Sequence, residues 1–330
     1  MRATMTRSGL LLFSLMAWTA IAQNTSIDDL SLKRMVAHSD LRSAGKAFHM
    51  ELDFVAQQVN PPETGHLSWN WASKDLWRQE ITLGTFHQIT VRKQDQLFTA
   101  RNLGFTPLAV TQLNELLRDP SAKKGDWTIN KVKQPTSDGM KQCIELSDDA
   151  EKTHDWKRQI CINPTTEDVL SDEWNRGGES GKEEFADFQP YEDRSYPRSL
   201  SLVKNGVPAV RAVVTLLEEK SYDAAEFVAP PNAIVRRQCE HITYPVALHT
   251  PSPSYPAEAR RQHAAGTSIV SLTVLPDGSV ENVQLIGSSA KQLDTVTEQI
   301  VKTWKFKPAM CGAEPITYDI QVQVNFRLVR

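Results

Sequence analysis

The chain has 330 residues, of which 40% are hydrophobic and 23% are charged, values typical of a soluble globular protein of about two domains. Its 37 basic and 40 acidic residues give a net charge of −3. This balance, without a basic stripe, argues against nucleic acid as a partner. We therefore look for other partners along the chain.

The first residues have the pattern of an export signal. Arg2 and Arg7 precede an almost wholly apolar run at 10–22, and the run ends in the small–x–small pattern that signal peptidase reads. The run is shorter than the ~20 apolar residues of a membrane-spanning helix, so we expect residues 1–22 to be a cleaved signal peptide. The alternative is an uncleaved anchor in the inner membrane. Either reading makes the rest of the chain periplasmic.

Residues 23–232 are predicted to form a β-rich domain. A helix capped by Ser26 opens it. A second helix has Thr106 as its N-cap and Pro107 as its first residue, and Pro120 stops it. Strands are predicted at 46–56, 66–72, 76–83, 86–92, 127–134, 141–147, 156–163, 167–174, 184–191, 196–204 and 209–218. We expect a large, twisted antiparallel sheet with one or two helices against it.

The order of elements in this region is a helix, long meandering strands and an inserted helix. Together with FADF at 185–188 and YPRSL at 196–200, it resembles the LolA-like lipoprotein-carrier half-barrels of the bacterial envelope. The resemblance implies a concave apolar face that shelters an acyl chain or a peptide. Trp69, Trp71 and Trp77 then either line a ligand pocket or pack as ordinary core residues.

Four cysteines in an exported chain predict two disulfides. We favour Cys143–Cys161, since each residue lies in a short strand-like run, and this choice leaves Cys239–Cys311 as the second pair. The other two pairings remain open. A zinc site is the competing reading of the motif CEH at 239–241, but a second close pair of ligands is missing. We therefore predict neither a metal nor a cofactor.

Two proline-rich stretches, at 229–232 and 245–253, divide the chain. Residues 233–252 are therefore predicted to be a connector that leads to a last domain at 253–330. The elements predicted in that domain are a helix at 257–264, a strand at 267–275, a tight turn at 276–278, a strand at 279–286, a helix at 289–303 and a final strand at 316–328. This order predicts two helices on one face of a three-stranded antiparallel sheet, and the whole chain is an α+β protein.

The final strand has a strict period of two. Its apolar positions are Ile316, Tyr318, Ile320, Val322, Val324, Phe326 and Leu328, and polar residues lie between them. This alternation predicts one buried face and one wet face. A terminal strand often lies at the edge of a sheet, where its unpaired N–H and C=O groups can template another strand.

Several short motifs occur in order around this strand: PSYP at 253–256, PDG at 276–278, LD at 293–294 and WKFKP at 304–308. With them, residues 245–330 resemble the C-terminal domain of the TonB energy transducers. The resemblance implies that the final strand binds an extended segment of an outer-membrane receptor, the TonB box, by strand addition. The residues implied are Ile320, Gln321, Val322, Gln323, Val324, Asn325, Phe326 and Arg327, with help from Ser252 and Tyr255.

The sequence also departs from that family. A folded domain stands where the transducers have a long proline-rich spacer, and Ser252 stands where the best-known members often have Gln. Energy transduction in the strict sense is therefore doubtful, whereas peptide binding in TonB-dependent transport remains the expectation. The alternatives left open are a carrier of a lipid or apolar ligand with the last domain as a docking module, a homodimer joined through the last strands, and coverage of the strand by the first domain.

Motifs typical of enzymes are incomplete or absent in this sequence. The stretch GGESGKE at 177–183 imitates a phosphate-binding loop, but its glycine spacing is one residue short and Glu183 replaces the Ser or Thr that holds magnesium. The sequence has no G-x-S-x-G motif, and no two of its histidines lie four residues apart. We predict no enzymatic activity and no catalytic residues.

Overall fold

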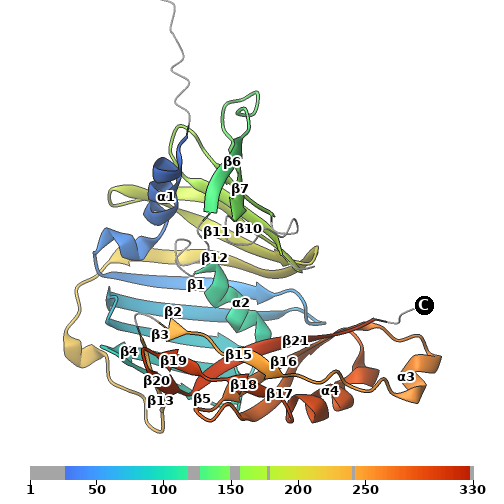
Figure 1. The fold of residues 1–330 in the computed structure, drawn as a ribbon. Helices are drawn as coiled ribbons and strands as arrows, with labels where there is room; N and C mark the ends of the chain where they lie inside the picture. The colour runs from blue at the N-terminus through green and yellow to red at the C-terminus, as the bar shows by residue number, and fades with distance from the viewer. Residues whose placement is uncertain (1–26, 118–126, 149–156, 177–178, 240–241, 328–330) are drawn as a thin grey trace, which may run out of the picture.

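The computed structural model describes residues 27–117, 127–148, 157–176, 179–239 and 242–327. The predicted signal peptide lies outside these residues. The described chain has the predicted α+β fold, with a large antiparallel sheet followed by a smaller sheet that carries helices (Figure 1). Within the described ranges no helix combines the length and the apolar character needed to cross a membrane.

The large sheet has 13 strands in the order β13-β5-β4-β3-β2-β1-β12-β11-β10-β9-β8-β7-β6. Most of its strands follow one another as antiparallel neighbours, and β12 returns beside β1. The strands are β1 (Phe48–Ala56), β2 (Glu63–Ser73), β3 (Leu76–Leu83), β4 (Phe86–Lys93), β5 (Gln96–Arg101), β6 (Trp127–Val132), β7 (Gln142–Asp148), β8 (Lys157–Ile162), β9 (Val169–Arg176), β10 (Glu179–Tyr191), β11 (Arg194–Lys204), β12 (Val207–Glu219) and β13 (Ile234–Arg237).

Strand β5 was not predicted, because only the turn before it carried a sequence signal. Gln94 adopts a positive φ of 53° in that turn, and β5 then pairs antiparallel with β4 from Arg101 opposite Gln88 to Gln96 opposite Lys93. The sequence of β5 lacks a clear alternation of buried and exposed residues, and all but one of its residues are partly buried. Its strand conformation therefore comes from pairing with β4 and β13.

Helix α1 (Asp29–His38) opens the described chain and is followed by the 3₁₀ turn η1 (Leu41–Ala44). The Asp28 carboxylate caps α1 by accepting a hydrogen bond from the Ser31 amide at 2.7 Å, whereas the predicted cap, Ser26, lies outside the described residues. The buried side of α1, including Leu32 and Val36, packs against β6 to β9. This apolar cluster is separate from the main core of the large sheet.

Helix α2 (Leu108–Leu116) lies against the large sheet and buries Val110, Leu113 and Leu116 in the main core. It starts one residue later than predicted. Pro107 has a φ of −55° and a ψ of 146°, so it precedes the helix and does not begin it, and Thr106 makes no capping bond to the helix. Thr106 instead donates its hydroxyl to Gln88 Oε1 at 3.0 Å.

The C-terminal sheet has the predicted three antiparallel strands, in the order β17-β16-β21. Helices cover one of its faces. The elements here, after the 3₁₀ turn η3 (Ala224–Glu226), are β14 (Ile242–Thr243), β15 (Val246–His249), α3 (Ala257–Arg261), β16 (Gly266–Val274), β17 (Val280–Ser288), η4 (Lys291–Leu293), α4 (Asp294–Val301), β18 (Lys305–Lys307), β19 (Ala309–Cys311), β20 (Glu314–Ile316) and β21 (Tyr318–Phe326).

Three details of this region differ from prediction. The helix predicted at 289–303 is divided into η4 and α4. Ile316 belongs to β20, where it pairs with Ala309, so the final strand begins at Tyr318. The predicted connector contains strands: β13 extends the large sheet, while β14 and β15 pair with β19 and β18.

The connector is fastened to both sheets. Strand β13 pairs with β5 at the edge of the large sheet, and Cys239, two residues later, is bonded to Cys311 at the end of β19. Arg237 also forms an ion pair with Glu314. The small sheet β14-β19-β20, which belongs to the C-terminal region, is therefore tied to the end of β13 by a covalent bond.

Candidate functional site

The outer edge of β21 is the feature on which the functional hypothesis depends. Strand β21 pairs with β16 along its whole length, from Tyr318 opposite Val274 to Phe326 opposite Gly266. It ends the three-stranded sheet, and within the described chain β16 is the only strand that pairs with it. Each alternate residue of such an edge strand directs its N–H and C=O away from the sheet. Strand β21 thus presents a row of main-chain donors and acceptors to a further strand.

The even-numbered side chains of β21 fix the strand to the helical layer. Val324 and Phe326 are buried, and Ile320 and Val322 are partly buried, in one cluster with residues of α3, η4 and α4. Tyr255, which lies just before α3, packs edge-to-face on Phe326 with ring centroids 5.7 Å apart. These contacts hold one face of β21 in place, so binding a further strand would cost little additional ordering of β21.

The odd-numbered side chains of β21 point toward the large sheet. Two of them bond across to β16: Thr273 donates to Asp319 at 2.7 Å, and Thr267 donates to Asn325 at 2.6 Å. Gln321 donates to the hydroxyl of Thr111 in α2 at 2.8 Å. The face predicted to be wet is therefore exposed at Gln323 and Asn325 but half-buried at Gln321, where it meets α2.

Helix α2 lies between the two sheets. Its inner side is buried in the large sheet, and its other side contacts the C-terminal sheet through Thr111 and through Leu108, which lies close to Gly287 of β17. Thr111 carried no signal in the sequence, because nothing local marks a residue that bonds to a strand two hundred positions away. The face of the C-terminal sheet opposite its helices is thus partly covered by the first domain, while the outer edge of β21 stays unpaired.

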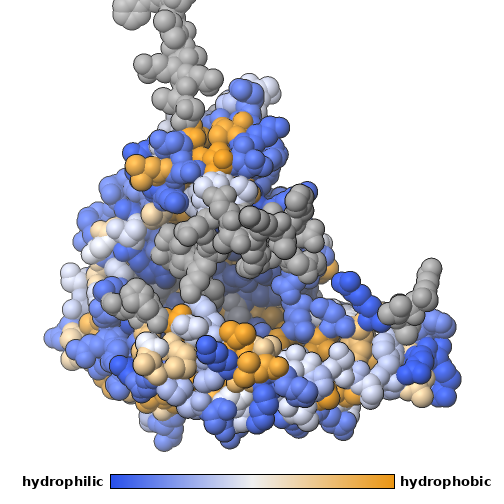
Figure 2. All heavy atoms as spheres, viewed as in Figure 1, coloured by the Kyte–Doolittle hydropathy of each residue, from blue (hydrophilic) through white to orange (hydrophobic). Residues whose placement is uncertain are grey.

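A groove lies between the two sheets, over the face of the C-terminal sheet that its helices leave uncovered. It has a volume of about 1370 Å³ and is lined by residues of β16, β17 and β21, including Gln323, on one side and by Trp174, Lys204 and Val207 on the other. Figure 2 shows the surface recessed between the large sheet and the C-terminal domain. Gln321 and Gln323 of β21 therefore face a space that the first domain also lines.

The remaining predicted residues lie near the end of β21. Arg327 follows the strand and is exposed. Ser252 is exposed in the segment before α3, and the neighbouring carbonyl of Pro251 accepts a hydrogen bond from Trp304 Nε1 at 3.2 Å. Tyr255 contacts β21 directly, as described above, whereas Ser252 has no described contact with the strand.

The cysteines form the two disulfides favoured from the sequence. Cys143 and Cys161 lie opposite each other in β7 and β8 and are bonded, as are Cys239 and Cys311. Cys239 is thus engaged in a disulfide and does not act as the zinc ligand weighed as an alternative. In the described ranges, the acidic, histidine and cysteine side chains form no cluster of three that could hold a metal ion.

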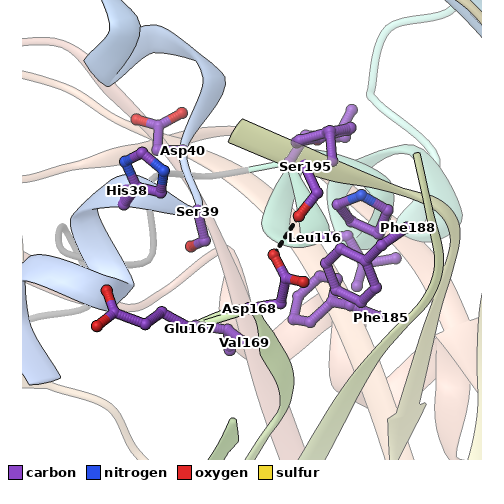
Figure 3. Close-up of a pocket in the computed structure, with 13 residues that line it drawn as sticks. His38, Ser39, Asp40, Leu116, Glu167, Asp168, Val169, Phe185, Phe188 and Ser195 are labelled. Atoms are coloured by element: carbon purple, nitrogen blue, oxygen red, sulfur yellow. Dashed lines mark hydrogen bonds between the residues drawn. The ribbon is translucent and has the colours of Figure 1, made fainter. Parts of the chain in front are cut away.

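A small apolar pocket lies at the end of α2 (Figure 3). Leu116, Phe185 and Phe188 line it, and its volume is about 40 Å³. At its rim Ser195 donates its hydroxyl to Asp168, and the His38 ring lies across the pocket from Ser195. The Ser195–Asp168 bond links β11 to the residue that precedes β9.

Comparison with known proteins identifies the C-terminal region. Residues 251–328 match the family model of the Gram-negative bacterial TonB protein C-terminal domain. The protein tonB2 of Pseudomonas aeruginosa is 37% identical over 82 residues, and the TonB proteins of Escherichia coli and Vibrio cholerae are each 30% identical, over 82 and 77 residues. The matches cover 23–24% of this chain and 30–34% of those relatives. The predicted resemblance of the last domain is confirmed.

The large sheet has its own likeness among solved structures. A LolA superfamily protein from Nitrosomonas europaea is similar to 62% of this chain and 98% of its own, with a TM-score of 0.45 and 9% identity. A putative outer-membrane lipoprotein-sorting protein domain from Vibrio parahaemolyticus is similar to 60% of this chain and 95% of its own, with a TM-score of 0.43 and 10% identity.

Proposed function

We propose that this protein binds extended, TonB-box-like segments of outer-membrane receptors by strand addition at the outer edge of β21, and that it serves TonB-dependent transport. The observation that carries the proposal is the unpaired edge of β21 in the described chain, within a region that matches the TonB C-terminal family. The residues proposed to meet the guest strand are Ile320 to Arg327. The proposed location is the periplasm, where disulfides such as the two found here persist.

The energetics favour weak and reversible engagement. About five added main-chain hydrogen bonds contribute roughly 1 kcal/mol each, whereas association costs about 4–15 kcal/mol. Side-chain contacts must therefore supply the rest. We propose that Tyr255, which packs on Phe326, and the exposed Ser252 supply part of them at the end of β21, while the groove beside Gln323 accepts side chains that point toward the first domain.

The test is a titration of the exported full-length chain, labelled with ¹⁵N, with TonB-box peptides. We expect amide shifts in β21 at 318–326 that exceed those elsewhere. A second series uses peptides methylated at one backbone nitrogen at a time. Because only alternate residues of a strand bond to its neighbour, methylation is expected to weaken binding by about 2- to 12-fold at every second position and little between.

The control is a peptide of the same composition in scrambled order, which should leave the β21 amides unmoved. Shifts that never reach 318–326 would show that the acceptor strand is wrong. Weakening without a period of two would show that the peptide binds through side chains and not as an added strand.

A second candidate function is carriage of a lipid or apolar ligand by the first domain. The observation that favours it is the apolar lining of the pocket in Figure 3, formed in part by Leu116, Phe185 and Phe188. At about 40 Å³ the pocket has room for little more than one water molecule, so an acyl chain must displace these side chains to enter. Native mass spectrometry of gently purified protein tests it, since a carrier should retain an acyl ligand.

A further inference from the structure

Another cavity lies on the other side of α2 from the groove. Of the residues proposed to meet a guest strand, only Ile320 and Gln321 line it. It has a volume of about 680 Å³, within the usual range of small-molecule sites. One wall is formed by Trp69, Trp71 and Trp77 of the large sheet. The opposite wall is formed by β16, by Asn282 of β17 and by the first residues of β21, including Asp319. The cavity therefore lies between the two sheets and is open to solvent on part of its surface.

The charged side chains that line this cavity are mainly basic. They are Arg42, Lys74, Arg101 and Arg236 against the single carboxylate of Asp319. Arg42 has its own partner, since its Nε donates to Asp40 at 2.8 Å. Arg236 pairs with Asp319, whereas among the described residues no carboxylate forms an ion pair with Arg101, so the described lining is more basic than acidic.

Arg101 and Arg236 form the centre of this charge. Arg236 Nη2 lies 3.6 Å from Asp319 Oδ1. Arg101 donates to neutral acceptors, the Thr106 hydroxyl at 3.2 Å and the Gly104 carbonyl at 3.1 Å. Burial lowers the pKa of Arg101, the attraction of Asp319 opposes this change, and the nearby charge of Arg236 adds to the lowering. Arg101 and Arg236 thus line the same cavity, and Asp319 pairs with Arg236.

Hydrogen-bond donors on the same residues are left without acceptors. Arg101 Nε, Arg236 Nε, Arg42 Nη2 and Trp69 Nε1 are covered from solvent and unpaired. A covered donor without a partner costs about 1–3 kcal/mol, and native proteins contain few of them. Because these four atoms are covered by neighbouring groups, a ligand in the cavity would meet the other nitrogens of the Arg101 and Arg236 guanidinium groups.

We infer that this cavity binds an organic oxyanion, a carboxylate or a phosphate carried on an apolar body. The head group lies at Arg101 and Arg236, whose planar guanidinium groups match the geometry of a carboxylate or phosphate. The apolar body lies against Trp71 and Trp77, since indole rings provide a large apolar surface. The cavity shares Ile320 and Gln321 with the strand proposed to bind a peptide, but the anion would be held by Arg101 and Arg236 and does not require that a peptide bind there.

The experiment measures the affinity of the full exported chain for four probes by calorimetry, with tryptophan fluorescence as a second readout. 1-Naphthoate carries an aromatic body and laurate carries an alkyl body. Comparing their affinities shows which kind of apolar body the cavity accepts. 1-Naphthalenemethanol lacks the charge, and inorganic phosphate lacks the body. We expect naphthoate or laurate to bind at least tenfold more tightly than both naphthalenemethanol and inorganic phosphate.

The variants Arg101→Gln and Arg236→Gln should each weaken that binding at least tenfold. The matched control is Arg211→Gln, because Arg211 is an exposed residue of β12 whose neighbour Ala212 points into the core. It makes the same change of charge on the opposite face of the sheet and should leave affinity unchanged. Thermal unfolding of each variant checks that the fold is retained.

Three outcomes would overturn the inference. Equal affinity for naphthoate and naphthalenemethanol would show that the negative charge does not contribute to binding. Equal affinity for inorganic phosphate and naphthoate would show that the apolar wall does not contribute. Failure of both organic anions to bind would show that the basic cavity only holds water. If Arg211→Gln weakens binding as much as Arg101→Gln does, the anion is attracted by overall charge and not by this cavity.

Discussion

A pair of glycine substitutions tests how closely the turn between β16 and β17 is packed. Gly278 has a φ of +80°, and a Cβ built on it would lie 2.0 Å from the carbonyl oxygen of Phe306. The backbone of Phe306 cannot move away freely, because its amide donates to the Gly278 carbonyl at 2.9 Å. Gly312 also has a positive φ, of +63°, but no atom lies within 4 Å of its added Cβ. An alanine at either site would therefore have the cost of a positive φ, but only an alanine at position 278 would also clash with the Phe306 carbonyl.

The magnitudes follow from these two terms. A non-glycine residue in the left-handed region costs about 1–2 kcal/mol, and this is the whole loss expected for Gly312→Ala. The additional clash is an overpacking term of about 1–3 kcal/mol. Gly278→Ala should therefore destabilise the C-terminal domain by roughly 2–5 kcal/mol.

Urea unfolding of the full chain, followed through amide signals of the C-terminal sheet, measures both losses. The slope of unfolding free energy against urea should be unchanged in both variants, so that the midpoints alone report stability. If the two variants lose the same stability, the close approach to Phe306 relaxes without cost and the reasoning is wrong. A larger loss for Gly312→Ala would refute it more strongly.

Two further predictions concern charges in the large sheet. His66 lies between Glu51 and Asp53, each 2.7 Å from a ring nitrogen; burial lowers its pKa, but the two carboxylates outweigh burial and raise it. Protonated His66 should therefore stabilise the folded state below pH 6.5, and this contribution should be lost as the pH rises through the raised pKa. An NMR titration in which the pKa of His66 is at or below its ordinary value would contradict this prediction. Arg158 is buried and bonds Asp172 through both Nε at 3.0 Å and Nη2 at 2.7 Å. Arg158→Met should cost about 3–5 kcal/mol by urea unfolding, and Arg158→Met with Asp172→Leu should recover most of that loss; a double variant no more stable than the single one would refute this account.

Local patterns predicted the strands whose partners lie nearby. The alternation from Tyr318 to Phe326 gave the face of β21 that packs under the helices, and the Pro276-Asp277-Gly278 sequence gave the turn in which Gly278 has its positive φ. Both are short-range signals, since they depend on a period of two and on the conformational freedom of one residue. The same reasoning extended β21 too far, because Ile316 follows the alternation but pairs with Ala309 in another sheet.

The surroundings of the site could not be predicted in this way. The bond from Gln321 to Thr111 and the approach of Arg101 to Arg236 join residues that are far apart in the chain. The first follows from the packing of the C-terminal sheet on α2, and the second follows from the pairing of β13 with β5. No sequence motif records either arrangement. The free edge of β21 was foreseen through family resemblance, whereas the cavity on the other side of α2 became visible only in three dimensions.

The Cys239–Cys311 bond determines how the molecule would respond to mechanical tension. A pull on a segment held by β21 passes back along the backbone to Cys311, crosses the sulfur bridge to Cys239 and reaches the large sheet through β13. The stretch of chain between the two cysteines, 72 positions in sequence, is excluded from this path. Without the bridge, a pull that unfolded the chain between these two positions could extend it to roughly 240 Å before the force reached the first domain. The bridge thus makes the coupling between the two domains short and stiff.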